Sequence, residues 1–104
     1  MRDEMEVLKK IKGHVLNNPI RLGIMVYLLS KGKSSFKTLQ DLLEVTPGNL
    51  DSHLRALEKE GYVELRKAIM DRPRTIVVVT GRGVEETRKY LAELKRLVKD
   101  IEKY

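Results

Sequence analysis

The spacing of hydrophobic residues along the chain changes at about residue 61 and again at about residue 83. Before the first change, hydrophobic residues recur every three or four positions, which is the spacing of one face of a helix. Between the two changes they alternate with polar residues or form a β-branched run, as they do in strands. The pattern predicts four helices, two strands and a last helix, over residues 1–17, 19–30, 35–44, 47–60, 62–66, 75–80 and 83–104.

Local signals support the limits of these helices. Asn18-Pro19 and Thr46-Pro47 each place a capping side chain directly before a proline, and proline is favoured at the first helical position. Gly32 follows the second helix and fits a left-handed terminating conformation. We interpret Gly81-Arg82-Gly83 as a turn that leads from the last strand into the last helix.

The inner faces of three helices can be assigned. In the helix over 47–60, Leu50, Leu54 and Leu57 recur at helical spacing, so we expect them to anchor this helix to the core. The helix over 19–30 is hydrophobic on nearly every side, which predicts a central position. The residues expected to face inward from the short helix between them are Phe36, Leu39, Leu42 and Leu43.

Two short helices joined by a tight turn and followed by a β-hairpin form a helix-turn-helix with a wing. The junction Leu43–Pro47 supplies a turn of suitable length. We therefore predict a mainly α fold with a β-hairpin wing (α+β). Residues 1–104 are expected to form one domain, with a winged core over 18–80 between an N-terminal helix over 1–17 and a dimerisation helix over 81–104.

Composition narrows the classes of function. The chain has 104 residues, and 21 Lys and Arg against 15 Asp and Glu give a formal net charge of +6, which favours a polyanionic partner. The absence of cysteine excludes disulfides, thiol catalysis and cysteine-ligated zinc. Hydrophobic runs are too short to span a bilayer, so we expect a soluble, cytoplasmic protein that does not bind membranes.

Neither an enzyme nor a metal site is expected. No nucleophile–base pair, paired carboxylates or glycine-rich cofactor loop stands out in the sequence. The two histidines, His14 and His53, lie far apart and lack patterned acidic partners. We predict no catalytic residues, no cofactor and no metal.

The side of the 47–60 helix opposite its leucines carries the candidate DNA contacts. Small and polar residues gather in its first half, which is the part of such a helix that reads base edges in the major groove. The candidates are Thr46, Pro47, Gly48, Asn49, Ser52, His53 and Arg55. Two alternatives stay open: His53 can instead pack on the preceding helix, and Asp51 can pair with Arg55.

The tip of the hairpin offers a second candidate contact. Arg72 and Arg74 flank Pro73, and arginines at such a tip can enter a narrow minor groove. Asp71 could hold one of the two guanidinium groups, and Lys67 could reach phosphates along the hairpin. The alternative is that these charges only keep the tip soluble.

The last helix carries two neighbouring hydrophobic rows, of which the first has heptad spacing. Together with the hydrophobic face of the N-terminal helix, these rows predict a homodimer, although the last helix could instead pack on its own domain. The candidate interface residues are Met5, Leu8, Tyr90, Leu91, Leu94, Leu97, Val98 and Ile101.

Specific motifs carry a resemblance to a known family. Thr46-Pro47-Gly48-Asn49-Leu50, Ser52-His53-Leu54, Leu57-Glu58 and Gly61-Tyr62-Val63 resemble the winged helix-turn-helix transcriptional regulators of the MarR and ArsR superfamily, in particular a small bacterial and archaeal subgroup. The resemblance extends over about residues 17–86. It implies that the helix beginning at Thr46-Pro47 is the recognition helix, that Asp71–Arg74 is the wing tip, and that the protein is a homodimer joined by its terminal helices.

Two features depart from that family. The chain is short for a MarR protein with a ligand pocket at the dimer junction, and it lacks the cysteines of the usual ArsR metal sites. No small-molecule effector is therefore assigned. We expect a dimeric transcriptional regulator that binds specific double-stranded DNA. The alternative is a winged helix used for protein interaction without DNA contact.

Overall fold

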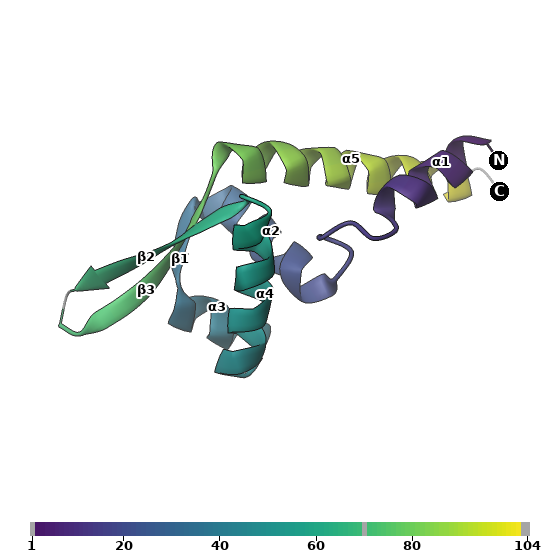
Figure 1. The fold of residues 1–104 in the computed structure, drawn as a ribbon. Coiled ribbons are helices and arrows are strands. Elements are labelled where there is room, and N and C mark those ends of the chain that lie inside the picture. The colour runs from purple at the N-terminus through teal and green to yellow at the C-terminus, as the bar shows by residue number, and fades with distance from the viewer. Residues whose placement is uncertain (1, 70, 103–104) are drawn as a thin grey trace.

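The computed structural model describes residues 2–69 and 71–102, which form five helices and a three-stranded antiparallel sheet (Figure 1). In chain order the elements are α1 (Arg2–Ile11), α2 (Pro19–Lys31), β1 (Lys33–Ser35), α3 (Phe36–Leu43), α4 (Pro47–Lys59), β2 (Val63–Ile69), β3 (Pro73–Val79) and α5 (Gly81–Glu102). The predicted α+β winged-helix fold is confirmed. Met1 and residues 103–104, which belong to the predicted terminal helices, lie outside the described residues.

The predicted helix starts are correct at the two proline sites. Asn18 Oδ1 accepts hydrogen bonds from the backbone N–H groups of Ile20 and Arg21, and Thr46 Oγ1 accepts one from Asn49 at 3.1 Å. Gly32 directly follows α2 as predicted and donates to the carbonyl of Leu28 at 2.7 Å. Its φ of 81° with ψ of −41° is not the left-handed helical conformation that was expected. These limits are set by side chains within a few residues, which is why the sequence predicts them.

The sheet has the order β1–β3–β2, with β3 in the middle. Val77 of β3 is buried and lies opposite Ser34 of β1 and Leu65 of β2. The hairpin is longer than predicted, because Ile69 still pairs with Pro73. The prediction that Pro73 and Arg74 belong to the turn was therefore wrong, since both are in β3. Strand β1 was not predicted, because three residues are too few to show a pattern.

Helix α2 lies at the centre of the core, as its hydrophobicity predicts. Ile24, Met25 and Leu28 are fully buried. Across from them, the predicted leucine row of α4 is also buried: Leu50, Leu54 and Leu57 are each at most 1% exposed. One expected core residue is not in the core. Leu42 is 57% exposed, because α3 packs inward through Leu39, with Leu43 only partly covered.

Helix α1 is shorter than predicted and packs on the C-terminal half of α5 (Figure 1). It ends at Ile11, and the following turns contain Gly13 with φ 76° and lead to Leu16, which is fully buried. Val7, which is 1% exposed, is the buried residue of α1. The helix cannot continue to residue 17 because the chain must turn there to place Leu16 in the core.

Helix α5 begins at Gly81, so the prediction of a turn over 81–83 was wrong. Thr80 starts the helix earlier, because its hydroxyl accepts a hydrogen bond from Gly83 N–H at 2.9 Å and donates to the carbonyl of Gly61 at 2.6 Å. The molecule is elongated, 55 by 26 by 21 Å, with the wing and α1 toward opposite ends (Figure 1). None of the helices in residues 2–69 and 71–102 has the length and hydrophobicity needed to cross a membrane.

Candidate nucleic-acid interface

The outer side of α4 is an exposed polar surface held in place by the buried leucines beneath it. Among the predicted contact residues, those of the first turns lie together at the start of α4 and are all exposed: Thr46, Pro47, Gly48, Asn49 and Ser52. The hydroxyl of Thr46 is used to cap the helix. The side chains of Asn49 and Ser52 make no hydrogen bond within the described residues, so they are available to an external partner.

His53 is half-buried and contacts the preceding part of the chain. Its Nδ1 lies 3.2 Å from Nη1 of Arg21, which is in the first turn of α2. Burial, together with the nearby Arg21 charge, lowers the pKa of His53 below its ordinary value, and this favours the neutral ring. The sequence left open whether His53 packs on the preceding helix or contacts DNA. In the structure its ring contacts Arg21 of α2, and a contact with DNA stays a prediction.

Arg55 is exposed but lies between two carboxylates of its own helix. Its guanidinium is 3.5 Å from Asp51 and 3.2 Å from Glu58. The structure thus contains the Asp51–Arg55 pair that the sequence suggested. Exposed pairs of this kind are weak, so a phosphate group can replace the carboxylates as the partner of Arg55.

The wing presents its two arginines differently. Arg74 makes hydrogen bonds to both carboxylate oxygens of Asp71 at 3.2 and 3.3 Å, and these bonds lower the pKa of Asp71. Arg72 is exposed and has no ion pair among the residues that the structure describes. Lys67 on β2 donates to the hydroxyl of Thr75 at 2.8 Å. The wing therefore has one fixed arginine, one unpaired arginine and one lysine on its flank.

Two hollows show that α4, the start of α3 and the wing form one surface. A cavity of about 150 Å³ is lined by Asp51 and Arg55 of α4 together with Lys67 of the wing. Its neighbour, about 280 Å³, is lined by Lys37 of α3 and by Arg72 and Arg74. Both hollows share the side chains of Phe36 and Thr75. Of the predicted contacts on α4, Arg55 thus lies next to the wing.

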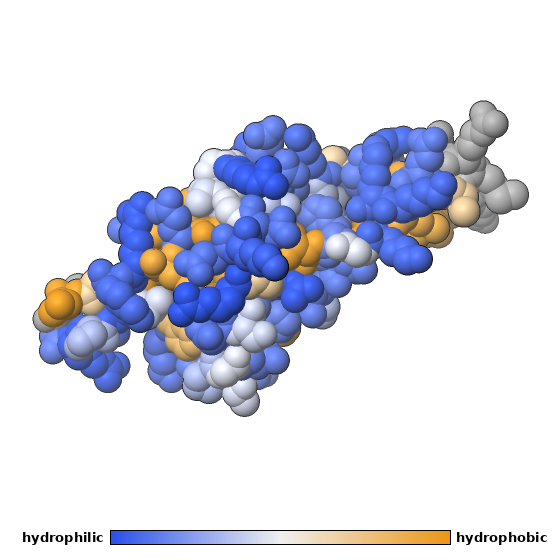
Figure 2. Space-filling view, in the orientation of Figure 1, coloured by the Kyte–Doolittle hydropathy of each residue, from blue (hydrophilic) through white to orange (hydrophobic). Residues whose placement is uncertain are grey.

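Sequence reasoning missed a hydrophobic residue at the wing. Ile69 is 85% exposed at the end of β2, and Figure 2 shows hydrophobic colour at this end of the molecule. An isolated isoleucine beside a polar turn gives no pattern from which its exposure could be predicted. It lies opposite Pro73 in the register, directly next to the two wing arginines.

The predicted interface residues of α1 and α5 fall into three groups. Met5, Leu8, Val98 and Ile101 are between 48% and 61% exposed. Leu91, Leu94 and Leu97 are half-buried. Tyr90 is only 5% exposed, since its ring lies 4.7 Å from that of His14 within the same chain, and it has little surface left for a partner.

A cavity of about 450 Å³ lies between α1 and α5 beside this ring pair. His14 and Tyr90 line it together with Lys10 and Glu93, whose side chains form an ion pair at 3.3 Å. Burial lowers the pKa of His14, although the negative charges of Glu86 and Glu60 act to raise it.

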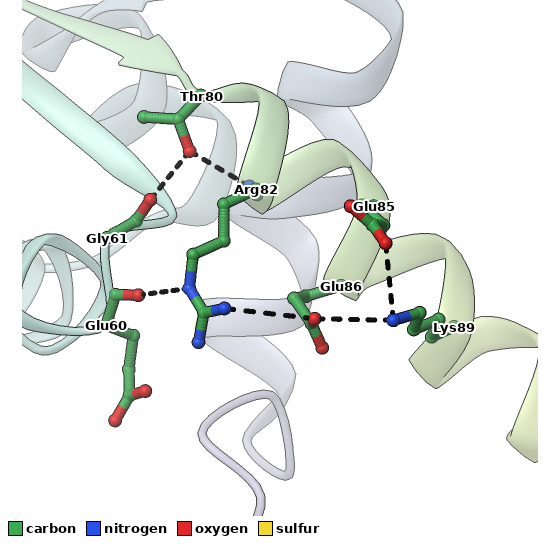
Figure 3. Close-up of polar contacts among 8 residues, drawn as sticks. Glu60, Gly61, Thr80, Arg82, Glu85, Glu86 and Lys89 are labelled. Atoms are coloured by element: carbon green, nitrogen blue, oxygen red, sulfur yellow. Dashed lines mark hydrogen bonds and ion pairs between the residues drawn. The ribbon is translucent and has the colours of Figure 1, made fainter.

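A polar joint that the sequence did not reveal connects α5 to the end of α4 (Figure 3). Arg82 Nε donates to the carbonyl of Glu60 at 2.9 Å, and the Arg82 guanidinium lies over the ring of Tyr62 at 5.6 Å. Glu86 is 4.0 Å from Arg82 and 3.7 Å from Lys89 (Figure 3). Because Glu60 caps α4, this joint connects the start of α5 to the end of α4.

Comparisons with known proteins agree with this architecture. Residues 20–98 match a family described as winged helix DNA-binding domain. An uncharacterized protein of Methanocaldococcus jannaschii is 34% identical over 89 residues, which are 85% of this chain and 97% of that protein. The solved structure of a transcriptional regulator homologue from Pyrococcus horikoshii OT3 is 49% identical, with a TM-score of 0.88 over 92% of this chain and 97% of the other.

More distant structures share the fold. The transcriptional regulator BldR from Sulfolobus solfataricus has 19% identity and a TM-score of 0.65, over 90% of this chain and 70% of BldR. The organohalide-sensing transcriptional regulator RdhR-CbdbA1625 has 16% identity and a TM-score of 0.74, over 96% of this chain and 59% of the other. The family match covers most of the chain, and the chain therefore belongs to the winged helix DNA-binding domain family.

Proposed function

We propose that the protein regulates transcription by binding specific double-stranded DNA as a homodimer. In this proposal residues 18–80 bind DNA, α4 enters the major groove, the wing contacts the minor groove or the backbone, and the terminal helices join two copies. One observation carries it. Above its row of buried leucines, α4 exposes Arg55, which lines a hollow together with Lys67, and this hollow adjoins the one lined by Arg72 and Arg74.

The chemistry of α4 suits the reading of base edges. Asn49 offers an amide that can form a paired hydrogen bond with adenine, and Ser52 offers a hydroxyl that can donate or accept. Gly48 has no side chain, and even a Cβ atom added there would meet nothing within 4 Å, so the backbone can come close to DNA. Arg55 lies further along the helix, where it would reach a phosphate.

The chemistry of the wing suits the phosphate backbone and the minor groove. Within residues 2–69 and 71–102, Arg72 forms no ion pair with a carboxylate that DNA binding would have to break. Arg74 is hydrogen-bonded to Asp71. Arginine side chains favour narrow minor grooves because the negative potential is concentrated there. Lys67 and Lys37 line the two hollows beside the wing and add positive charge there.

Binding to duplex DNA tests the first part of this proposal. We expect an oligonucleotide duplex to bind with log affinity that falls linearly with log salt between about 50 and 200 mM, with a slope of about −0.9 per neutralised phosphate. Fluorescence anisotropy of a labelled duplex measures this slope, and selection of bound fragments from random duplexes identifies the preferred sequence. Absence of binding at low salt would instead favour a protein-interaction module.

Dimerisation is supported by the exposed hydrophobic residues at the far end of α5, away from the α4 and wing face (Figure 1). A two-fold dimer would place two recognition helices about one turn of DNA apart, roughly 34 Å, and would read a palindromic site. Burying the four exposed side chains of α1 and α5 between two copies would remove them from water.

Charge substitution at these residues is expected to dissociate the dimer. In the variant with Val98→Glu and Ile101→Glu, two carboxylates would be buried in the interface, so sedimentation equilibrium should show a monomer. The matched control is Lys99→Glu, which changes the net charge by the same amount at an exposed position of α5 and should remain dimeric. Wild-type protein that sediments as a monomer at micromolar concentration would contradict the proposal.

A further inference from the structure

The contact between Arg21 and His53 determines which ring nitrogen of His53 carries hydrogen. Arg21 Nη1 lies 3.2 Å from His53 Nδ1. A guanidinium group can donate hydrogen bonds but cannot accept them. Nδ1 must therefore be the acceptor. In the neutral ring the remaining hydrogen is then on Nε2, because the bond made by one nitrogen sets the state of the other.

Arg21 is held firmly enough to impose this state. Its backbone N–H is bonded to the capping side chain of Asn18 at 3.1 Å, which fixes the residue in the first turn of α2. Its Nε donates to the carbonyl of Val15 in the segment before α2. The guanidinium is thus bonded both to the carbonyl of Val15 and to the ring of His53. Because a guanidinium group carries only N–H donors, Arg21 cannot accept a hydrogen bond from His53.

The other edge of the His53 ring is without a partner in the described part of the chain. Nε2 lies on the side of the imidazole away from Nδ1 and hence away from Arg21. His53 is one turn after Asn49 on α4, so the two residues are neighbours on the helix surface. The ring is half-buried, which leaves part of it accessible beside the exposed polar face.

We propose that Arg21 is a positioning residue that holds His53 as a single hydrogen-bond donor, through Nε2–H, toward an acceptor on DNA. This inference rests on the proposed function and adds to it a defined chemical preference. The acceptor is a purine N7 or O6 atom in the major groove or a phosphate oxygen, and a donor group on the DNA would be rejected. Arg21 acts through His53 and need not touch DNA itself.

The state of the ring can be measured without DNA. Long-range ¹H–¹⁵N spectra of the free protein at pH 8 should show His53 with hydrogen on Nε2. In Arg21→Ala, a fraction with hydrogen on Nδ1 should appear, and the titration midpoint of His53 should rise because the neighbouring positive charge and the bond to Nδ1 are lost. Unchanged His53 spectra and midpoint in Arg21→Ala would overturn the proposal.

His14 provides an internal control in the same spectra. Its Nδ1 accepts a hydrogen bond from Leu16 N–H at 3.0 Å, and its ring packs on Tyr90. Because Val15, whose carbonyl accepts from Arg21, lies between His14 and Leu16, the His14 signals report whether the loss of Arg21 disturbs this segment. His14 signals that keep their positions in Arg21→Ala show that the variant is folded. If the His14 signals change as well, Arg21→Gln, which keeps a donor group, is compared with the wild type in place of Arg21→Ala.

Two substitutions of His53 test the contact with DNA. In His53→Gln, the side-chain amide nitrogen can lie near the position of Nε2 and donate. In His53→Asn, the side chain is too short for its amide nitrogen to reach that position. On the selected duplex, His53→Gln should bind within a few-fold of the wild type, while His53→Asn should bind about tenfold more weakly. Equal affinity of the two variants would overturn the proposal.

The pattern of loss identifies the acceptor. A base acceptor predicts that His53→Asn loses affinity only for the selected sequence, and a phosphate acceptor predicts an equal loss on every duplex. If the wild type binds no duplex at all, the proposed function has failed, and the NMR result still decides whether Arg21 sets the state of His53. The two failures are therefore distinguishable.

Discussion

Gly83→Ala is expected to destabilise the protein strongly, because α5 meets the core at this residue without room for a side chain. A Cβ atom at Gly83 would lie 2.2 Å from the carbonyl oxygen of Tyr62 and 3.1 Å from the Met25 side chain. That carbonyl also accepts a hydrogen bond from Thr80 N–H at 3.0 Å, so it cannot move aside freely. Overpacking of this kind costs about 1–3 kcal/mol and sometimes more.

Urea denaturation followed by circular dichroism measures this effect, and Gly81→Ala is the matched control. Gly81 is in the first turn of the same helix, and a Cβ there would meet nothing within 4 Å. Gly81→Ala should be neutral or should stabilise the protein by about 0.4–1 kcal/mol, because alanine reduces the freedom of the unfolded chain. Equal stability of the two variants would show that α5 does not pack on Tyr62 in this way.

The double variant Arg72→Ala with Arg74→Ala is expected to weaken DNA binding about a hundredfold at low salt, if each arginine contributes about 1.4 kcal/mol through a charged hydrogen bond. It should also make the salt dependence shallower by up to about 1.8 in slope, since each phosphate contact contributes about 0.9. Anisotropy titrations of the same duplex at several salt concentrations measure both quantities.

The control for the wing is Arg88→Ala with Arg96→Ala, which removes the same charge from exposed positions of α5. If the loss of affinity depends on the position of the arginines, this control should bind DNA nearly as well as the wild type. A similar loss in both double variants would mean that only net charge matters. Wild-type affinity in the wing variant would remove the wing from the interface.

Much of the fold could be predicted because the deciding interactions are local. The capping of α2 by Asn18 and of α4 by Thr46 depends on residues within three positions. The burial of the α4 leucines follows from their spacing. Where the prediction was wrong, the local structure depends on contacts between residues that are far apart in the chain. The three residues of β1 are a strand only because they pair with β3. Helix α5 starts early because Thr80 is also bonded to Gly61.

The candidate site divides in the same way. The sequence could place the polar residues on the outer side of α4, because helical spacing alone decides it. It could not predict the bond from Arg21 to His53 or the one from Arg82 to Glu60, since each joins residues far apart in the chain. Periodicity also could not separate contacts within one chain from contacts between copies. Tyr90 shares the hydrophobic side of α5 with Val98, yet His14 of the same chain covers it.

The joint at Arg82 attaches the first turn of α5 to the end of α4. A helix of 22 residues at 1.5 Å per residue is about 33 Å long. If two copies are joined at the far end, a tilt of about 5° there displaces the near end by about 3 Å, nearly the rise of one base pair. Because Arg82 and Gly83 connect that end to α4 and the core, the angle between two copies in the proposed dimer would decide whether both α4 helices can enter the grooves at once.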